Sequence, residues 1–323
     1  MTEFTLIDRY CQNIGRVHSD TRIGVGDDAA VISVPNDKEL VISVDTMVEG
    51  VHFFTEVTPA NLAHKLLAVN LSDMAAMGAV PRWATLALTL PSEDSQWLAA
   101  FSESLNLCAE QYGVQLIGGD TTQGSLTLSL QIMGLVPQGQ ALTRAAAKPG
   151  DDVYITNNVG DAALALALLK KQIQVEGIDQ SALLKALELP EPQLDMGQAL
   201  LPFACACIDV SDGLVADLSH IADRSEVSIN LDVTQIPISK NYQAYVAQGG
   251  NLALALSGGD DYQLAFTAAA EHAVAINSVA QSLNVDVSKI GQVVNRMQQP
   301  LNLHADGDDY ILDNVTGYQH FND

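Results

Sequence analysis

Six short clusters of aspartate beside small residues are the places in this chain where chemistry could occur. They are Gly26-Asp27-Asp28, Ser43-Val44-Asp45-Thr46, Asn70-Leu71-Ser72-Asp73, Gly118-Gly119-Asp120-Thr121, Asp209-Val210-Ser211-Asp212-Gly213 and Ser257-Gly258-Gly259-Asp260-Asp261. Aspartate beside glycine is common in ordinary turns, because Asp caps and tolerates irregular backbone. This structural explanation suffices for any one cluster, so a chemical role has to be argued from the whole set.

The clusters as a set favour a divalent metal site. Several follow apolar segments, at 41–44, 116–117 and 205–208, and we expect them where a buried strand or helix ends. Carboxylates gathered at such ends repel one another unless a cation neutralises them. Oxygen ligands with few His and no Cys suit Mg²⁺ or Ca²⁺ better than zinc. Because Mg²⁺ characteristically bridges carboxylates to phosphates, the clusters predict Mg²⁺ and a phosphorylated substrate.

Two common nucleotide-binding motifs do not explain the glycines. The segment Gly24-Val25-Gly26-Asp27-Asp28-Ala29 fits G-x-G-x-x-A, and Asp45 lies near the spacing of a ribose-binding acid. However, the following residues 31–34 read as a strand where a helix is required, and two Asp would face the pyrophosphate. The chain also contains no Gly-Lys dipeptide, which excludes a P-loop. If a nucleotide binds, Mg²⁺ and backbone amides would have to hold its phosphates.

Few basic or nucleophilic residues lie near the clusters. Arg144, with Lys148 four residues later, is either an exposed structural residue or a cation that offsets phosphoryl charge. His52 closely follows the cluster at Asp45, but a single His is more often packed or at the surface than a ligand. Cys108 has the spacing of a core residue on a helix, and the chain has no G-x-S-x-G motif. Nucleophilic catalysis is therefore not indicated.

The composition restricts the partners of the chain. Its 323 residues contain 39 Asp and Glu against 15 Lys and Arg, which gives a net charge of −24. Such an acidic surface repels nucleic acid and anionic lipid, so we expect neither as a partner. Only 17% of residues are charged and 48% are hydrophobic, which indicates a folded chain. With four cysteines, no apolar run of 18 residues and no signal-like start, we expect a cytoplasmic protein.

Strands and helices alternate along the chain and predict two α+β domains. We expect a boundary between residues 138 and 149, because Lys148-Pro149-Gly150-Asp151-Asp152 is the clearest turn cluster, and we therefore expect domains at 1–138 and 149–323. The expected strands are 40–44, 85–90, 126–136, 153–156, 228–233 and 264–267, and the expected helices are one opening at Thr58-Pro59 and those at 92–112, 162–169 and 215–222. A hairpin is expected between 301–304 and 310–312, because Asp306-Gly307 lies between them.

Seven motifs in this order resemble the thiamine-monophosphate kinase family, which shares a superfamily with aminoimidazole ribonucleotide synthetase and selenophosphate synthetase. They are GVGDDAA, SVDTMVEGVHF, AVNLSDMAAMGA, LIGGDTT, LTRAAAKPGD, IDVSDGLVADL and LSGGDDYQL, and the likeness runs from about Phe4 to Phe321. The resemblance implies an N-terminal α+β domain whose mixed sheet pairs across a homodimer, a C-terminal α/β domain and no P-loop. It also implies direct, Mg²⁺-assisted transfer of the ATP γ-phosphoryl group to thiamine monophosphate, the last step of thiamine diphosphate synthesis.

The resemblance also implies a role for individual residues. The implied ligands of several Mg²⁺ ions are Asp28, Ser43, Val44 through its backbone, Asp45, Asp73, Asp120, Asp209 and Asp212. The residues implied to face ATP are Gly119, Asp120, Arg144 and Ser211, and those implied to line the thiamine pocket are His52, Asp260 and Tyr318. The residues implied to act most directly in catalysis are Asp120, Arg144 and Asp212. Asp27 would lie behind the ligands, and no general base is named, because the acceptor phosphate is itself a nucleophile.

The chain departs from the family pattern at three places. Asp260 stands where the family usually has Glu, Asn157-Asn158 replaces Thr-Gly, and Val315 replaces an aromatic residue. These changes bear on substrate affinity more than on reaction type.

Two other functions are disfavoured by the sequence. Another ATP-dependent phosphate-activating enzyme of the superfamily is disfavoured, since Cys11 lacks the setting of a reactive cysteine. A non-enzymatic Ca²⁺ binder is disfavoured because no segment fits the D-x-[DN]-x-[DN]-G loop.

Overall fold

The computed structural model describes residues 3–312 and residue 317. Contacts divide the chain into two compact units. The first comprises Met1–Met74 and Ala79–Gln140, and the second comprises Ala75–Gly78 and Ala141–Asp323. None of the helices in the described part of the chain has the length and apolar character needed to cross a membrane.

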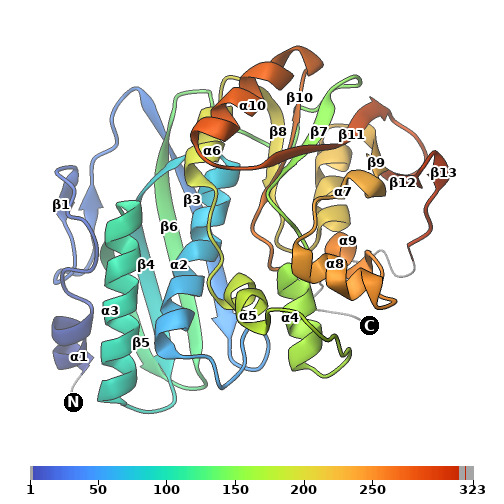
Figure 1. The fold of residues 1–323 in the computed structure, drawn as a ribbon. Coiled ribbons are helices and arrows are strands. Elements are labelled where there is room, and N and C mark those ends of the chain that lie inside the picture. Colours follow the sequence, from blue (N-terminus) through green and yellow to red (C-terminus); the bar gives the residue numbers. More distant parts are fainter. Residues whose placement is uncertain (1–2, 313–316, 318–323) are drawn as a thin grey trace. The chain divides into compact units, whose positions relative to one another are not determined.

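The first unit is built on one four-stranded sheet. Its elements are α1 (Glu3–Tyr10), β1 (Thr21–Ile23), β2 (Val31–Ile32), β3 (Lys38–Val48), α2 (Pro59–Ala76), β4 (Val80–Leu90), α3 (Ser95–Tyr112), β5 (Gln115–Gln123) and β6 (Thr127–Pro137). The strand order is β3-β6-β4-β5, in which only β4 and β5 are parallel. Figure 1 shows α2 and α3 side by side on one face of this sheet. The sheet is therefore mixed, with β3 and β5 as its outer strands.

The two faces of this sheet are buried by different partners. A small apolar cavity is lined by Leu67 of α2, Leu105 of α3 and Leu130 of β6, so the helices cover the face that carries Leu130. On the opposite face, a second cluster gathers residues of the sheet with residues at and before β2. Its members are Trp83, Ile117, Met133, Leu135, Ala30, Ile32 and Leu40. Every strand thus alternates between two environments, as the twofold period of a strand requires.

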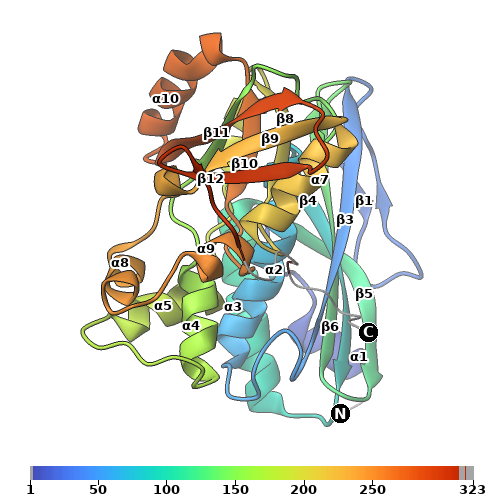
Figure 2. The same cartoon turned by 90° about the vertical axis from the view of Figure 1, so that its right-hand side faces the viewer.

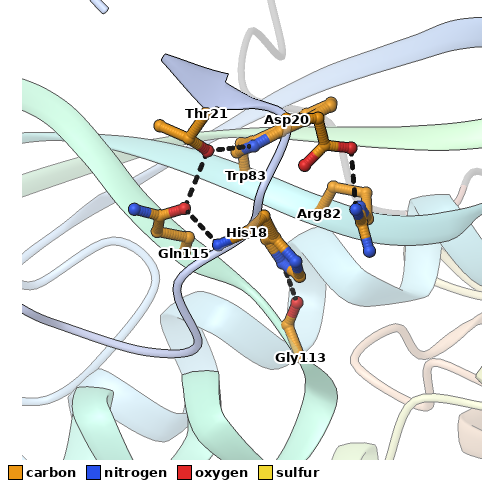
Figure 3. Close-up of polar contacts among 7 residues, drawn as sticks. All are labelled: His18, Asp20, Thr21, Arg82, Trp83, Gly113 and Gln115. Atoms are coloured by element: carbon orange, nitrogen blue, oxygen red, sulfur yellow. Dashed lines mark hydrogen bonds and ion pairs between the residues drawn. The ribbon is translucent and has the colours of Figure 1, made fainter. Parts of the chain in front are cut away.

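A polar network ties the segment before β1 to the sheet (Figure 3). The Thr21 hydroxyl donates to Gln115 Oε1 at 2.8 Å and accepts from the Trp83 indole N–H at 2.8 Å. The same Gln115 oxygen also accepts from the backbone N–H of His18 at 3.0 Å. One side chain at the start of β5 therefore fixes the strand that leads into the Gly24–Asp28 loop.

His18 and Asp20 add two further links in this network (Figure 3). His18 Nε2 lies 2.7 Å from the carbonyl oxygen of Gly113, which ends α3 in the left-handed conformation. Burial lowers the pKa of the His18 ring, so the ring is held as a neutral donor to that carbonyl. The Asp20 carboxylate accepts from Arg82 Nη2 at 2.7 Å.

The second unit is built on a seven-stranded sheet. Its elements are β7 (Asp152–Thr156), α4 (Asp161–Leu169), α5 (Gln180–Glu188), α6 (Leu194–Leu200), β8 (Ala204–Asp209), α7 (Leu214–Arg224), β9 (Val227–Asp232), α8 (Lys240–Ala247), α9 (Ala253–Ser257), β10 (Leu264–Ala268), α10 (Ala273–Ser282), β11 (Val287–Asn295), β12 (Leu301–Ala305) and β13 (Asp308–Asp309), with 3₁₀ turns at Val233–Gln235 and Ala270–His272. The strand order is β13-β12-β9-β11-β7-β10-β8, and within it only β12 and β9 run parallel.

The centre of the second unit is buried on both faces of its sheet. All five residues of β7 and all five of β10 are buried, which explains why the stretches 153–155 and 264–266 are apolar throughout and do not alternate. Helix α7 contacts β8, β9 and β12 of this sheet, and Leu214, Leu218 and Ile221 form its buried stripe. Figures 1 and 2 both place α7 alongside the strands. The start of α7 is thereby fixed against the end of β8.

The predicted two-domain fold of mixed sheets and helices is confirmed, but helices α1, α5, α6, α8, α9 and α10 and strands β1 and β11 were not predicted. The expected helix 92–112 begins at Ser95, because the Asp94 carboxylate accepts from the N–H groups of Gln96 and Trp97 and caps it there. The expected hairpin forms, but its second strand is Asp308–Asp309 and not 310–312. Strand β5 was not predicted, because its Gly118-Gly119-Asp120 segment looks like a turn.

The network around Gln115 generates a prediction about stability. Replacing Gln115 by Met keeps the side-chain length but removes the acceptor that Thr21 and His18 share, so we expect a loss of about 1–3 kcal/mol in unfolding free energy. Gln123→Met, at the exposed end of the same strand, should change stability by less than about 0.5 kcal/mol. Urea unfolding measures both variants, and equal midpoints for the two would contradict the anchoring role.

Candidate functional site

Two carboxylates and a hydroxyl meet between β3 and α2 in the first unit. The Ser43 hydroxyl donates to Asp73 Oδ2 at 2.5 Å. Ser43 and Asp45 are two residues apart on β3, so their side chains share a face. They pair with Ile132 and Leu130 of β6 and therefore lie on the face that the helices cover. The structure thus brings Ser43, Asp45 and Asp73 together, as the sequence analysis expected for metal ligands.

The surroundings of Asp45 are unfavourable for a negative charge. Burial, together with the nearby Asp73 carboxylate, raises the pKa of this carboxyl to about 7. Val44 lies between Ser43 and Asp45 on β3 and its side chain is exposed on the other face, so its backbone carbonyl is its only group suited to a cation. The three residues Ser43, Asp45 and Asp73 offer hard oxygen atoms, which are the ligands that suit Mg²⁺.

Asp120 is not part of this group within one chain. Residues that pair on neighbouring strands share a face of the sheet. Across the sheet from β5 to β3, Asp120 is aligned with Ala87, then Ser129, then Thr46. Asp120 therefore lies on the face opposite Asp45. It also lies on the opposite outer strand, three interstrand spacings or about 14 Å along the sheet. If both carboxylates bind metal, Asp120 of the same chain does not share an ion with Asp45.

The expectation that these carboxylates mark strand ends was wrong for Asp45 and Asp120. Strand β3 continues to Val48 and β5 continues to Gln123. Both are outer strands, where a polar side chain can stand among paired residues without entering the core. Gly119 sustains the pairing, since a Cβ there would lie 1.9 Å from the Leu86 carbonyl oxygen. Gly119 therefore has a close-packing role in β5 besides its expected role toward ATP.

Three further predicted residues of the first unit lie in loops. The Asp27 carboxylate accepts from the backbone N–H of Asp28 at 2.9 Å, and both residues are exposed between β1 and β2. Asp27 thus shapes the backbone at Asp28, which suits a residue placed behind the ligands. His52 Nδ1 accepts from the backbone N–H of Val48 at 3.0 Å, so the ring closes the turn after β3 and presents Nε2 away from that turn.

In the second unit, Asp209, Ser211 and Asp212 occupy the junction between β8 and α7. Asp209 is the last residue of β8 and is buried, whereas Ser211 and Asp212 are half-buried. The loop is held by a residue that the sequence analysis missed. Asp217 Oδ2 accepts from the backbone N–H groups of Ser211, Asp212 and Gly213, each at 3.1 Å.

Asp217 is 3% exposed. Burial and, to a lesser extent, the Asp212 carboxylate raise the pKa of Asp217 while the three N–H donors lower it, and the net result is a pKa of about 7. The signal available in the sequence was a single Asp in the otherwise apolar first turns of α7, at 214–218. Asp in the first turn of a helix is ordinary, so this signal alone did not indicate a role.

The segment 257–263 is paired with the β8–α7 loop through its backbone. Asp260 N–H donates to the Ser211 carbonyl oxygen at 2.9 Å, and Tyr262 N–H donates to the Val210 carbonyl oxygen at 2.8 Å. Gly259 permits this approach, because a Cβ there would lie 2.2 Å from the Ser211 oxygen. Ser211, which is expected to face ATP, and Asp260, which is expected to line the thiamine pocket, thus belong to one hydrogen-bonded structure.

Asp260 is held in a strained position. Asp260 and Tyr262 both have left-handed backbone, at φ 69° and 51°, which is uncommon outside glycine. The Tyr262 hydroxyl donates to Asp260 Oδ1 at 2.9 Å. Strain of this kind persists only where the surroundings impose it, and it concentrates at functional sites.

Asp261 and Asn157 have structural partners. Both oxygens of Asp261 accept from the Gly160 N–H, at 2.8 and 3.0 Å, and burial raises the pKa of Asp261 well above its ordinary value. Asn157, one of the residues that depart from the family pattern, donates to Gln263 Oε1 at 3.0 Å and accepts from the Asp286 N–H. The family departure at Asn157 therefore serves packing of this unit.

The remaining predicted residues are only partly described. Arg144 is exposed, and its carbonyl oxygen accepts from the Ser225 hydroxyl at 2.9 Å. Tyr318 and Val315 lie outside the described residues. Across 3–312 and 317, no three or more His, Cys, Asp or Glu side chains are gathered in one metal-binding group. The oxygen set at Ser43, Asp45 and Asp73 is the part of the predicted cage that the first unit assembles.

Comparison with known proteins places these features in a family. The AIR synthase related protein N-terminal domain matches residues 26–136, and the corresponding C-terminal domain matches residues 148–300. The thiamine-monophosphate kinase of Escherichia coli K12 is 44% identical over 320 residues, covering 99% of this chain and 98% of that protein. This chain belongs to the thiamine-monophosphate kinase family. The resemblance drawn from its seven motifs is thereby confirmed.

Solved structures of the thiamine-monophosphate kinase family have the same fold. The enzyme from Stenotrophomonas maltophilia K279a has a TM-score of 0.84 at 40% identity, covering 96% of this chain and 98% of that one. The structure of AaThiL complexed with AMPPCP and TMP has a TM-score of 0.77 at 28% identity, covering 90% of this chain and 89% of that one. Similarity to the family therefore extends over both units.

The Asp45 environment in this family member generates a prediction about pH. Since its folded-state pKa lies above the ordinary value, metal-free protein should lose stability as the pH rises from about 4 to about 7. Asp73→Asn removes the neighbouring charge and keeps an oxygen for Ser43, so the Asp45 pKa should fall but stay above its ordinary value, because burial is the larger cause. Side-chain ¹³C NMR titration measures it, with exposed Asp94→Asn as the control. An unchanged Asp45 pKa in Asp73→Asn would refute the coupling.

Proposed function

We propose that this chain transfers the γ-phosphoryl group of ATP to the phosphate of thiamine monophosphate, which yields thiamine diphosphate and ADP. The observation that carries the proposal is identity of 44% with the E. coli enzyme over almost the whole of both chains. A related protein has been solved with AMPPCP and TMP, which are the two ligand types this reaction requires. The reaction would be the last step of thiamine diphosphate synthesis.

The acidic residues fit Mg²⁺ as the cofactor. Ser43, Asp45 and Asp73 supply hard oxygen atoms, and the burial that raises the Asp45 pKa together with the neighbouring Asp73 carboxylate makes a bound cation favourable. The residues proposed to hold several ions are Asp28, Ser43, the Val44 carbonyl, Asp45, Asp73, Asp120, Asp209 and Asp212. When bound, Mg²⁺ supplies neutralisation of the phosphate charges.

Gly119, Asp120, Arg144 and Ser211 are proposed to face ATP. Phosphoryl transfer depends mainly on positioning and on charge neutralisation, and Arg144 is a cation able to offset the charge of the transferred group. The expectation that backbone amides also hold phosphate does not extend to Ser211, Asp212 and Gly213. Their N–H groups already donate to Asp217. The charge of the phosphates at this loop is therefore proposed to be neutralised by Arg144 and the metal ions. We propose Asp120, Arg144 and Asp212 as the catalytic residues.

His52, Asp260 and Tyr318 are proposed to line the thiamine pocket. The Tyr262 hydroxyl orients the Asp260 carboxylate, which compensates in part for a side chain one methylene shorter than the usual Glu. The acceptor in this reaction is a phosphate oxygen, which is already nucleophilic. The chain therefore needs residues that hold the two phosphates in line and exclude water, and it needs no residue to remove a proton.

A homodimer and a cytoplasmic location complete the proposal. Ile42 and Val44 are 53% and 58% exposed on the face of the sheet opposite the helices, where a second copy could cover them. All four cysteines, at 11, 108, 205 and 207, are free thiols, which suits a reducing compartment. Neither nucleic acid nor a membrane is proposed as a partner, because the net charge of −24 repels both.

The activity itself is tested with purified protein, ATP, Mg²⁺ and thiamine monophosphate. We expect thiamine diphosphate and ADP in equal amounts, measured by chromatography. Unphosphorylated thiamine should not replace thiamine monophosphate, because the acceptor is a phosphate. Absence of diphosphate above the no-enzyme background would sink the proposal.

The proposed metal group is tested with Asp73→Asn. This variant keeps the oxygen that accepts from Ser43 but loses a charge, so we expect turnover to fall by at least about 100-fold, with a melting temperature close to that of the unchanged protein. Asp94→Asn, which lies at the exposed cap of α3 in the same unit, should retain full turnover. Full activity in Asp73→Asn would remove Asp73 from the site.

A further inference from the structure

The loop between β8 and α7 is fixed by one buried carboxylate. The backbone N–H groups of Ser211, Asp212 and Gly213 all donate to the same oxygen of Asp217, at 3.1 Å each. Three successive N–H groups can converge on one atom only if the backbone curls around it. The Asp217 side chain thus specifies the conformation of the loop that carries two of the proposed site residues.

The residue that precedes α7 has no side chain that could supply these bonds. A helix usually has a polar side chain just before its first turn that accepts from the exposed N–H groups. Gly213 occupies that position here and has no side chain, and its φ of 125° lies in the region that favours glycine. Asp217 reaches back from inside the helix and takes the place of the missing cap. Its own backbone N–H donates to the Gly213 carbonyl oxygen at 2.9 Å, which closes a ring of bonds.

The fixed loop in turn holds the neighbouring segment. The carbonyl oxygens of Val210 and Ser211 accept from the N–H groups of Tyr262 and Asp260. A loop that is curled around Asp217 therefore presents Ser211 and Asp212 on one side and supports the strained backbone of Asp260 on the other. If the loop relaxed, both groups of residues would move.

From this geometry we propose that Asp217 is a positioning residue for the phosphoryl-transfer site. Its oxygen acts through Ser211 and Asp212, which it presents toward ATP and its metal ions, and through the paired Asp260 segment. Asp217 is 3% exposed and its Oδ2 is occupied by three backbone donors, so its effect is exerted through the loop and not by contact with a substrate. This proposal rests on the proposed function only in naming ATP and metal ions as what the loop binds. The curled conformation of the loop does not depend on the proposed function.

Four variants separate positioning from mere stabilisation. Asp217→Ala removes the acceptor, Asp217→Glu keeps the charge but moves the acceptor by one methylene, and Asp217→Asn keeps an oxygen at the same place. Asp179→Ala is the matched control, because Asp179 Oδ1 accepts from the N–H groups of Ser181 and Ala182 at the exposed cap of α5 in the same unit. All four proteins are compared for melting temperature, amide exchange, turnover and calorimetric binding of AMPPCP in the presence of Mg²⁺.

We expect Asp217→Ala and Asp217→Glu to weaken AMPPCP binding and lower turnover, each by at least about 10-fold. Asp217→Asn should stay within about three-fold of the unchanged protein in both measurements, because its amide oxygen accepts the same bonds. Amide exchange at 211–213 should accelerate in Asp217→Ala and not in Asp179→Ala. Asp179→Ala should lower the melting temperature while leaving binding and turnover unchanged.

Two results would overturn the proposal. In one, Asp217→Ala and Asp217→Glu melt earlier but bind AMPPCP as tightly as the unchanged protein, which makes Asp217 purely structural. In the other, Asp217→Asn is as impaired as Asp217→Ala, which means that binding and turnover depend on the charge of residue 217 and not on the position of its acceptor oxygen. Should Asp217→Ala fail to fold, the Glu and Asn variants still decide the question. If the unchanged protein makes no thiamine diphosphate, the proposed function fails, whereas amide exchange at 211–213 still tests the positioning.

Discussion

Carboxylates that lie close together away from water must find a positive partner, and this requirement governs both units of the chain. With 39 acidic residues against 15 Lys and Arg, ion pairs cannot supply that partner for most of them. The second unit meets the requirement with backbone N–H groups. Three of them surround Asp217, and Gly160 donates to both oxygens of Asp261. These acids are thus used to fix backbone conformation.

In the first unit, two carboxylates repel one another at one place. Asp45 and Asp73 face one another beside Ser43, and the raised pKa of Asp45 expresses the cost of a second negative charge there. A bound cation would lower the free-energy cost of the second negative charge, and this is the physical reason for proposing a metal ion beside Asp45 and Asp73. The contrast separates two classes of acid in one chain: those that fix backbone conformation and those proposed to bind Mg²⁺. Both classes look alike in the sequence, since each is an Asp near small residues.

Glycine determines how closely the supporting segments approach. At Gly119 the backbone of β5 passes so near to Leu86 that any side chain would collide with its carbonyl oxygen. At Gly259 the same is true of Ser211. Glycine in these clusters is therefore needed for close packing of backbone on backbone, in addition to any role toward a phosphate. This explains why Asp120 stands in the middle of a strand although its neighbours have the composition of a turn.

The sequence by itself determined the two-domain mixed fold, four of the ten α-helices that the structure describes, many of the strands, and the family, because apolar periodicity and ordered motifs are local properties. It also predicted that the oxygen atoms of its Asp clusters suit a hard cation. Only the tertiary structure decided which acids meet. Register across the four-stranded sheet separates Asp120 from Asp45, and chain packing brings Ser43 to Asp73 across 30 positions. The roles of Asp217 and Asp261 were equally hidden, since a carboxylate that accepts from distant or preceding backbone is recognised only when the fold shows where those N–H groups point.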